Sequence, residues 1–239
     1  MELFLDGVGN QVIGAVLTKK PDIPTAQRNV TTTMVPGSSH GSLTQYQGWQ
    51  DVTIKCSFQL VPTLIPGLTG IQGYNEVLRR LNAWAISAKR LKLSEDFNYY
   101  RLVKQVQIGD ASPSEIEVIG AVDVTFVLDP FWYEESDPVV LSKTGTVYNP
   151  GTMDSDPLLT VYGAGTLKFS VNGNELTLLN VRDYLTVDSW QQTILHGNDS
   201  GTYDEQLNGS YPKMLPGENT ITFSSGVTSM KIEGRWCWL

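Results

Sequence analysis

Residues 116–128 read IEVIGAVDVTFVL, and every second position from the first onward carries an apolar residue or glycine. Polar side chains, among them Glu117, Asp123 and Thr125, stand between them. A period of two is typical of a β-strand that buries one face and exposes the other. The stretch therefore predicts a long, half-buried strand.

The same pattern recurs upstream, where residues 52–60 read VTIKCSFQL. Cys56 lies on the apolar side of this run, so we expect a thiol that faces the core. Nothing else in the sequence indicates an oxidising compartment, so a disulfide between Cys56 and Cys237 is not expected and both should be reduced. Weaker alternation predicts partner strands at residues 11–17, 28–35 and 99–108.

One segment has a helical period instead. Between Asn75 and Arg90, apolar residues recur at steps of three and four, while charged and amide side chains fall on other faces. Asn75 is a suitable N-cap, and Lys89 and Arg90 suit the negative end of the helix dipole. We expect one amphipathic helix over about residues 75–90.

The pattern changes after the aromatic run FWY at residues 131–133, because acidic residues follow and no further helical period appears. Short β-like runs separated by turn signals are typical of a β-sandwich. Asn172-Gly173 predicts a tight hairpin, and Gly163-Ala164-Gly165 predicts another turn. We therefore predict two domains, 1–133 and 134–239. The strands expected in the second domain are 158–162, 167–171, 176–181, 185–190, 219–223 and 230–238.

Composition and charge exclude several classes of protein. The chain has 239 residues, with 17 Lys and Arg against 25 Asp and Glu, so its formal net charge is −8. This balance argues against binding nucleic acid, and the lack of a long uncharged apolar run argues against a membrane span. The first residues, MELFLDGVGN, contain no basic region, so no secretory signal is expected.

The sequence contains few residue patterns that are typical of catalytic or metal-binding sites. Two Cys and two His cannot form a close-spaced metal site, and His40 and His196 both lie among turn-forming residues where solvated loops are expected. The acidic stretches Glu134-Glu135 and Asp154-Ser155-Asp156 lack the surroundings of a glycosidase pair or a calcium loop. No phosphate-binding or dinucleotide-binding motif is present. We expect no catalytic residue, no metal site, no cofactor site and no enzymatic activity.

Four aromatic residues of the second half form a candidate sugar platform, since aromatic side chains combine a large apolar face with a polar tip. Packing in the core or between sheets is the competing interpretation of the same residues, and the one we favour. The candidates are Tyr184, Trp190, Tyr203 and Tyr211.

The order of several landmarks along the chain is more specific than any one of them. The landmarks, in order, are Val35-Pro36-Gly37 with Gly41, Phe58-Gln59-Leu60, Leu81-Asn82-Ala83-Trp84, Tyr99-Tyr100, Asp129-Pro130-Phe131-Trp132-Tyr133, Asn149-Pro150-Gly151-Thr152, Val161-Tyr162-Gly163, Val171-Asn172-Gly173, Asn208-Gly209, Leu215-Pro216-Gly217-Glu218-Asn219 and Arg235-Trp236. In this order they resemble the distal tail protein family of siphophages, or prophages, of Gram-positive bacteria. The resemblance covers almost the whole chain.

This resemblance implies a mainly β protein with one helix and two domains. The N-terminal domain would be a ring-forming β-sandwich or barrel-like domain, and the C-terminal domain a galectin-like β-sandwich. In such a family the motifs shape the fold, so the resemblance assigns no catalytic residue. It places Pro36, Gly37 and Gly41 in a loop of the ring-forming domain, and Phe131, Trp132 and Tyr133 at its end before the hinge, as interface or hinge candidates.

The implied function is that of a structural virion protein. It would be made in the host cytoplasm, form a homo-hexameric ring, single or stacked in two, at the tail tip or baseplate, and join the tail tube protein to the tail-tip hub protein. In many phages the ring also holds receptor-binding proteins. The alternative is a carbohydrate-binding module for host cell-wall polysaccharide that uses Tyr184, Trp190, Tyr203 and Tyr211.

Overall fold

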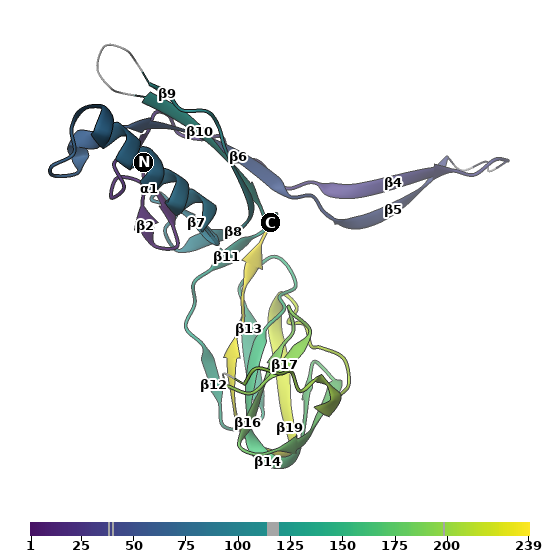
Figure 1. Ribbon diagram of the computed structural model, residues 1–239. Coiled ribbons are helices and arrows are strands. Elements are labelled where there is room, and N and C mark those ends of the chain that lie inside the picture. Colours follow the sequence, from purple (N-terminus) through teal and green to yellow (C-terminus); the bar gives the residue numbers. More distant parts are fainter. Residues whose placement is uncertain (38, 40, 114–119, 198) are drawn as a thin grey trace. The chain divides into compact units, whose positions relative to one another are not determined.

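The computed structural model describes residues 1–37, 39, 41–113, 120–197 and 199–239. The chain divides into two compact units, Met1–Trp132 and Tyr133–Trp238, with Leu239 grouped with the first. Antiparallel strands dominate both units, and the described residues contain a single α-helix (Figure 1). This confirms the prediction of a mainly β protein with one helix. No helix in these ranges has the length and apolar character needed to cross a membrane.

The N-terminal unit is built on one antiparallel sheet with the strand order β2-β1-β7-β8-β10-β6-β3. Strands β10 and β6 pair from Gly120↔Leu60 to Leu128↔Val52, which joins the two runs with the clearest alternation in the sequence. The beginning of the predicted run, residues 116–119, lies outside the described residues. The strands are β1 (Leu3–Leu5), β2 (Val8–Gly9), β3 (Ala15–Leu17), β6 (Val52–Leu60), β7 (Arg90–Leu93), β8 (Tyr99–Ile108), β9 (Ser112–Pro113), β10 (Gly120–Leu128) and β11 (Trp132–Glu134).

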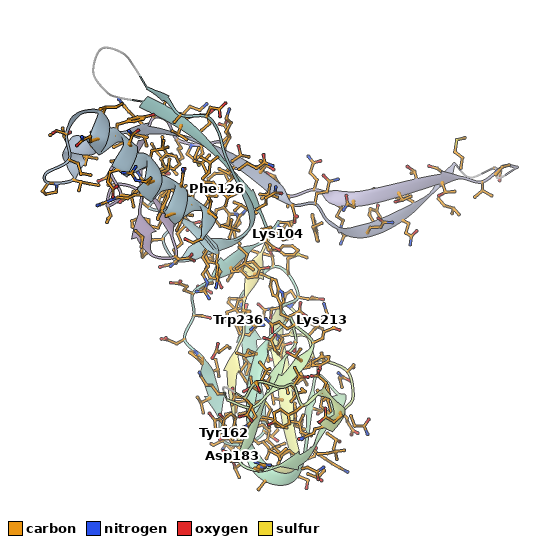
Figure 2. The ribbon with its side chains drawn as sticks, viewed as in Figure 1. Lys104, Phe126, Tyr162, Asp183, Lys213 and Trp236 are labelled. Carbon is orange, nitrogen blue, oxygen red and sulfur yellow. The ribbon has the colours of Figure 1, made fainter. Side chains whose placement is uncertain are left out.

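Helix α1 (Gly70–Ile86) packs on one face of this sheet (Figure 1). Its buried residues Val77, Leu81 and Trp84 join the inward-facing side chains of β6 and β10, including Phe126, which Figure 2 labels. Cys56 is buried in this core as expected, and its burial raises the pKa of the thiol to about 12. Neither Cys56 nor Cys237 is part of a disulfide within the described residues.

The predicted helix boundaries are wrong at both ends. The helix begins after Thr69, and Asn75, the predicted N-cap, lies inside it. The earlier start depends on Gly73, because a Cβ there would meet Pro62 Cβ and the Leu68 carbonyl carbon at 3.0 Å. Glycine has no side chain and so adds nothing to the apolar periodicity of the sequence. The periodic pattern therefore starts about one turn after the helix itself begins.

The helix ends at Ile86, earlier than predicted, because the carboxylate of Asp6 binds the backbone of the residues that follow it. Asp6 accepts hydrogen bonds from the backbone N–H groups of Lys89 and Arg90, at 2.9 and 3.0 Å. These bonds lead the chain from the helix into β7. The two basic residues therefore lie beyond the helix and not in its last turn.

The C-terminal unit is a β-sandwich in which two long strands, β14 and β19, pair with each other and contribute to both halves. Residues 158–162 and 167–171 were predicted as separate strands joined by a turn, but they form one bent strand with register shifts at Gly163. Its strands are β12 (Val139–Leu141), β13 (Gly145–Asn149), β14 (Leu158–Val171), β15 (Asn174–Val181), β16 (Tyr184–Asp188), β17 (Thr193–Leu195), β18 (Leu207–Asn208) and β19 (Gly217–Glu233). The last strand, β20 (Cys237–Trp238), is not part of the sheet that they form and pairs with β11.

Glycine is required where β14 and β19 bend against each other. A Cβ on Gly163 would lie 2.2 Å from the Gly226 carbonyl oxygen, and Gly226 has a φ of +73°. The predicted hairpin at Asn172-Gly173 is confirmed, since both residues have positive φ and Val171 pairs with Asn174.

Two buried asparagines hold the turns of the C-terminal unit, and both belong to the landmark motifs. Asn149 Nδ2 donates to the carbonyl oxygens of Met153 and Met214, and its Oδ1 accepts the Gly151 N–H at 2.8 Å. Asn219 is fully buried and makes four side-chain hydrogen bonds. These landmarks therefore specify the fold rather than a reaction.

The end of the chain is held by an ion pair whose carboxylate is buried. Arg235 donates two hydrogen bonds to Asp188, at 2.7 and 3.0 Å, and the N–H groups of Trp190 and Gln191 donate to the same carboxylate. Burial opposes ionisation of this carboxyl, but these bonds outweigh it and lower the pKa of Asp188. The pair fixes the chain next to Trp236, which packs in the core.

Candidate functional site

A two-stranded hairpin, β4 (Arg28–Met34) and β5 (Ser42–Trp49), projects from the sheet of the N-terminal unit (Figure 1). It forms a sheet of its own, and every residue of the two strands except Trp49 is exposed. Residues 27–49 contain no Asp, Glu or Lys, and Arg28 and His40 are the only residues that could carry a side-chain charge. The predicted interface residues Pro36, Gly37 and Gly41 lie exposed between the two strands, and His40 lies outside the described residues.

The register of the hairpin separates its side chains into two unlike faces. Val30 pairs with Tyr46, Thr32 with Thr44 and Met34 with Ser42, so these six side chains share one face. The three large apolar ones, Val30, Met34 and Tyr46, are 49 %, 86 % and 64 % exposed. The opposite face carries Thr31, Thr33, Leu43 and Gln45 and is mostly polar. The hairpin therefore presents an exposed apolar face, which we call the apolar arm face (Val30, Met34 and Tyr46).

Aromatic contacts fix the base of the hairpin. The Arg28 guanidinium lies over the rings of Tyr46 and Trp49, at 5.3 and 5.1 Å from their centroids. Trp49 contacts Phe131 edge to face at 6.2 Å. The hairpin is thus anchored to the folded unit at its base, while nothing in the described part of that unit covers its outer part.

The three aromatic hinge candidates fall into different surroundings. Phe131 packs against Trp49, and the Trp132 ring lies 4.3 Å from the guanidinium carbon of the buried Arg101. Tyr133 is buried in the C-terminal unit, 5.7 Å from Trp190. Residues 131 and 132 therefore complete one unit, and Tyr133 begins the next.

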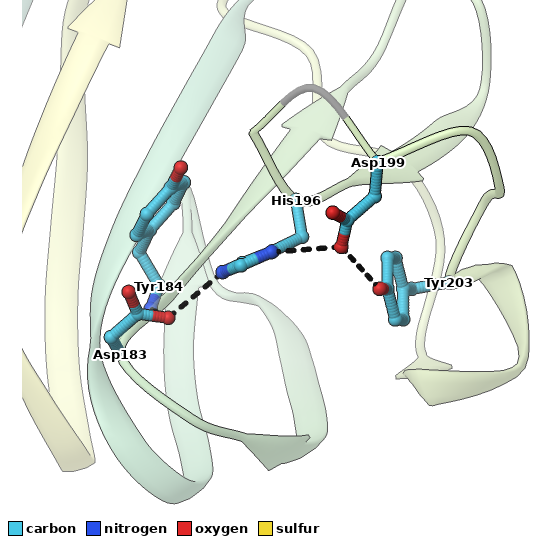
Figure 3. Close-up of polar contacts among 5 residues, drawn as sticks. All are labelled: Asp183, Tyr184, His196, Asp199 and Tyr203. Atoms are coloured by element: carbon cyan, nitrogen blue, oxygen red, sulfur yellow. Dashed lines mark hydrogen bonds and ion pairs between the residues drawn. The ribbon is translucent and has the colours of Figure 1, made fainter.

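The four sugar-platform candidates do not all come together. Tyr184 and Tyr203 lie on either side of His196, with ring centroids at 4.8 and 6.2 Å from the imidazole (Figure 3). Trp190 packs against Tyr133, and the Tyr211 hydroxyl donates to Asp204 at 3.4 Å. Two of the candidates thus flank a histidine that sequence reasoning assigned to a solvated loop.

His196 is held by two carboxylates (Figure 3). Its Nε2 lies 2.9 Å from Asp183 Oδ1 and its Nδ1 lies 3.0 Å from Asp199 Oδ2. The Tyr203 hydroxyl donates to the same Asp199 oxygen at 2.6 Å. Because a carboxylate can only accept, both imidazole nitrogens can donate at once only when the ring is protonated, so this arrangement favours the imidazolium form. Asp183 precedes β16 and His196 follows β17, so only the pairing of these strands brings the two together.

The pKa values follow from this geometry. Hydrogen bonds to Asp183 and then to Asp199 raise the pKa of His196 above its usual value. The His196 hydrogen bond lowers the pKa of Asp183, and the Tyr203 hydroxyl followed by His196 lowers the pKa of Asp199. The cluster is therefore most strongly bonded when the imidazole is charged and both carboxyls are ionised.

We expect the loop that follows β17 to loosen as the pH rises. Since the folded pKa of His196 lies above the unfolded value of about 6.5, its stabilising contribution is complete below that pH and is lost as the pH rises through the folded pKa. NMR titration of the imidazole should give a pKa above that of a free histidine, and amide exchange at residues 199–206 should accelerate through the same range.

His196→Gln is the control for this titration, because it removes the pH-dependent step and identifies the His196 signal among the two histidines of the chain. A His196 pKa at or below the ordinary value, or exchange that does not change with its ionisation, would contradict the role assigned to the two carboxylates.

In the described part of the chain, the acidic stretches Glu134-Glu135 and Asp154-Ser155-Asp156 do not form a cluster like that around His196. Asp156 forms an ion pair with Lys213 at 3.4 Å, and the Glu134 N–H donates to the Trp236 carbonyl oxygen. Among the described residues, no group of three or more His, Cys, Asp or Glu side chains is placed to hold a metal ion.

No model of a known protein family matches the sequence, and no curated protein matches it either. Solved structures with a similar fold include the following two. One is the crystal structure of Dit (gp 19.1) of phage SPP1, described as a paradigm of the hub adsorption apparatus in phages that infect Gram-positive bacteria. It is 12 % identical, with a TM-score of 0.67, over 97 % of this chain and 98 % of that chain.

The second is a chain in the structure of the phage P2 baseplate in its activated conformation with Ca. It is 10 % identical, with a TM-score of 0.52, over 92 % of this chain and 90 % of that chain. At these identities the likeness concerns the fold, and it extends through both compact units. The resemblance to distal tail proteins is thereby confirmed at the level of the fold: this chain has the fold of the SPP1 Dit protein over nearly its whole length.

Proposed function

We propose that this chain is a structural component of a phage tail tip or baseplate, and that its N-terminal unit assembles into a homo-hexameric ring. The observation that carries the proposal is the likeness to SPP1 Dit, which leaves almost no part of either chain unmatched. The ring would join the tail tube protein to the tail-tip hub protein and could hold receptor-binding proteins. The role proposed is structural rather than catalytic, and its place is the virion.

The hairpin supports an assembled state for a physical reason. A two-stranded ribbon is marginally stable alone, and its free edges and apolar side chains invite pairing or aggregation. Natural proteins protect such edges with charges or cover them, but this ribbon carries almost no charge. The exposure of the apolar arm face is best explained by a partner surface that covers it. In a closed ring that surface would be supplied by the neighbouring copy.

The assembly is tested by light scattering on a size-exclusion column, followed by negative-stain imaging of the main peak. A hexameric ring should have a mass of about 158 kDa, which is six times the 26.4 kDa of the chain, and should appear as closed particles. A monomer at about 100 µM that also binds neither the tail tube protein nor the hub protein of its phage would contradict the proposal.

A further inference from the structure

Four rings form a continuous row on the C-terminal unit, which we call the aromatic row (Tyr162, Tyr184, His196 and Tyr203). Tyr162 on β14 and Tyr184 on β16 are paired across the two strands, and their ring centroids are 5.5 Å apart. Tyr184 stacks on His196 at 4.8 Å with an interplanar angle of 30°, and His196 meets Tyr203 at 6.2 Å.

The row lies on the solvent side of the sheet. The chain neighbours Val161 and Leu185 pair with each other and are buried in the core, so Tyr162 and Tyr184 point the other way. Tyr162 is 37 % exposed, and its position beside Asp183 is visible in Figure 2. Burial in the core therefore does not account for the pairing of Tyr162 with Tyr184, whereas Tyr203 at the other end of the row is partly buried against the core.

Polar groups along the row are already oriented, and the imidazole uses only part of their bonding capacity. Asp183 binds His196 through Oδ1 and Asp199 binds it through Oδ2, so the second oxygen of each carboxylate is not used by the imidazole. Both side chains are about half exposed, at 62 % and 49 %. The row thus combines ring faces with fixed, solvent-facing acceptors.

We propose that the aromatic row binds a glycan built from neutral or amino-bearing pyranose units. The apolar C–H face of a pyranose packs on an aromatic ring, while its hydroxyl or ammonium groups donate to carboxylate oxygens. Because the imidazole and both carboxylates are held in place before a ligand arrives, little ordering entropy is lost on binding. This surface contains Tyr162 and His196 in place of Trp190 and Tyr211 of the sequence-based platform.

Charge restricts the class of glycan. Asp183, Asp199, Asp204 and Glu205 lie on or next to the row, and His196 and Arg182 are the cations that act on Asp199. The net charge around the row is negative, as is the net charge of the whole chain. Glycans that carry phosphate or carboxylate groups are therefore repelled, and neutral or cationic ones are favoured. This site is additional to the proposed tail role and does not depend on ring formation.

The test uses the full chain on an array of neutral, amino-bearing and phosphate-bearing oligosaccharides, followed by NMR titration with the strongest ligand. We expect binding to neutral or amino-bearing glycans, with shifts at His196 and loss of at least tenfold in affinity for Tyr184→Ala and for Tyr162→Ala. Tyr148→Ala is the matched control, because Tyr148 is an exposed tyrosine of the same unit that lies on β13, outside the row. It should bind within twofold of the unmodified chain.

Thermal unfolding of each variant separates a lost site from a lost fold. If Tyr184→Ala lowers the unfolding temperature, the affinity of Tyr162→Ala is the test of the site, since Tyr162 is the more exposed ring at the end of the row. No binding to any glycan on the array, a preference for the phosphate-bearing ones, or an affinity of both folded row variants equal to that of the unmodified chain would overturn the proposal.

Discussion

If the proposed ring forms through the apolar arm face, two glutamates on that face should convert the ring into monomers. In the double variant Val30→Glu and Met34→Glu, both substituted side chains are exposed in the single chain, so each chain should fold normally. If a neighbouring copy covers this face, each interface then has to bury two unpaired carboxylates. Even about 3 kcal/mol per interface weakens the contact by more than a hundredfold, so the mass measured by light scattering should fall from that of a hexamer to the 26.4 kDa of one chain.

The opposite face of the same strand provides the matched control. Thr31→Glu with Thr33→Glu adds the same charge to β4 but places it on the polar face. This variant should remain hexameric. If both variants form rings, the apolar arm face is not part of the interface. If both dissociate, the added charge rather than the face explains the loss.

The alternation in the sequence predicted some strands with their bounds and others only in part. Residues 219–223 and 230–238 were predicted as separate strands, but β19 runs unbroken from Gly217 to Glu233, and the predicted strand 11–17 begins only at Ala15.

Residues 99–108 form β8 with the expected bounds, although burial along β8 does not alternate. Residues 52–60 form β6 with the expected bounds as well, because this strand has one face on the core and so carries a period of two. Strand β5 (Ser42–Trp49) was missed for the converse reason. Neither face of the hairpin is buried within the chain, so no core imposed a pattern on it.

The candidate cluster was only partly predictable. Tyr184 and Tyr203 were identified by residue type, but His196 was not, because its partners lie thirteen positions before it and three after it. Asp183 reaches His196 only through the pairing of β16 with β17. Tertiary pairing of this kind leaves no local signal in a single sequence.

The other large effect is expected at Asn219, whose side chain is fully buried in the C-terminal unit. Its Nδ2 donates to the carbonyl oxygens of Leu215 and Gly217, at 2.8 and 3.0 Å, and its Oδ1 accepts from the Leu215 N–H and from Asn172 Nδ2, at 2.8 and 2.7 Å. Asn172 in turn accepts the Thr220 N–H at 2.9 Å. One side chain therefore links the turn before β19 to the β14–β15 hairpin.

Asn219→Ala should lower the free energy of unfolding of the C-terminal unit by about 3 to 5 kcal/mol, since several buried polar groups lose their partner at once. The corresponding fall in Tm is on the order of 15 °C for a unit of this size. Asn174→Ala is the control, because Asn174 bonds Ser210 at the exposed end of the same hairpin and should cost less than about 1 kcal/mol. Calorimetry that resolves the two units checks both values, and the transition of the N-terminal unit should not move. Equal, small losses in the two variants would show that Asn219 does not hold these turns together.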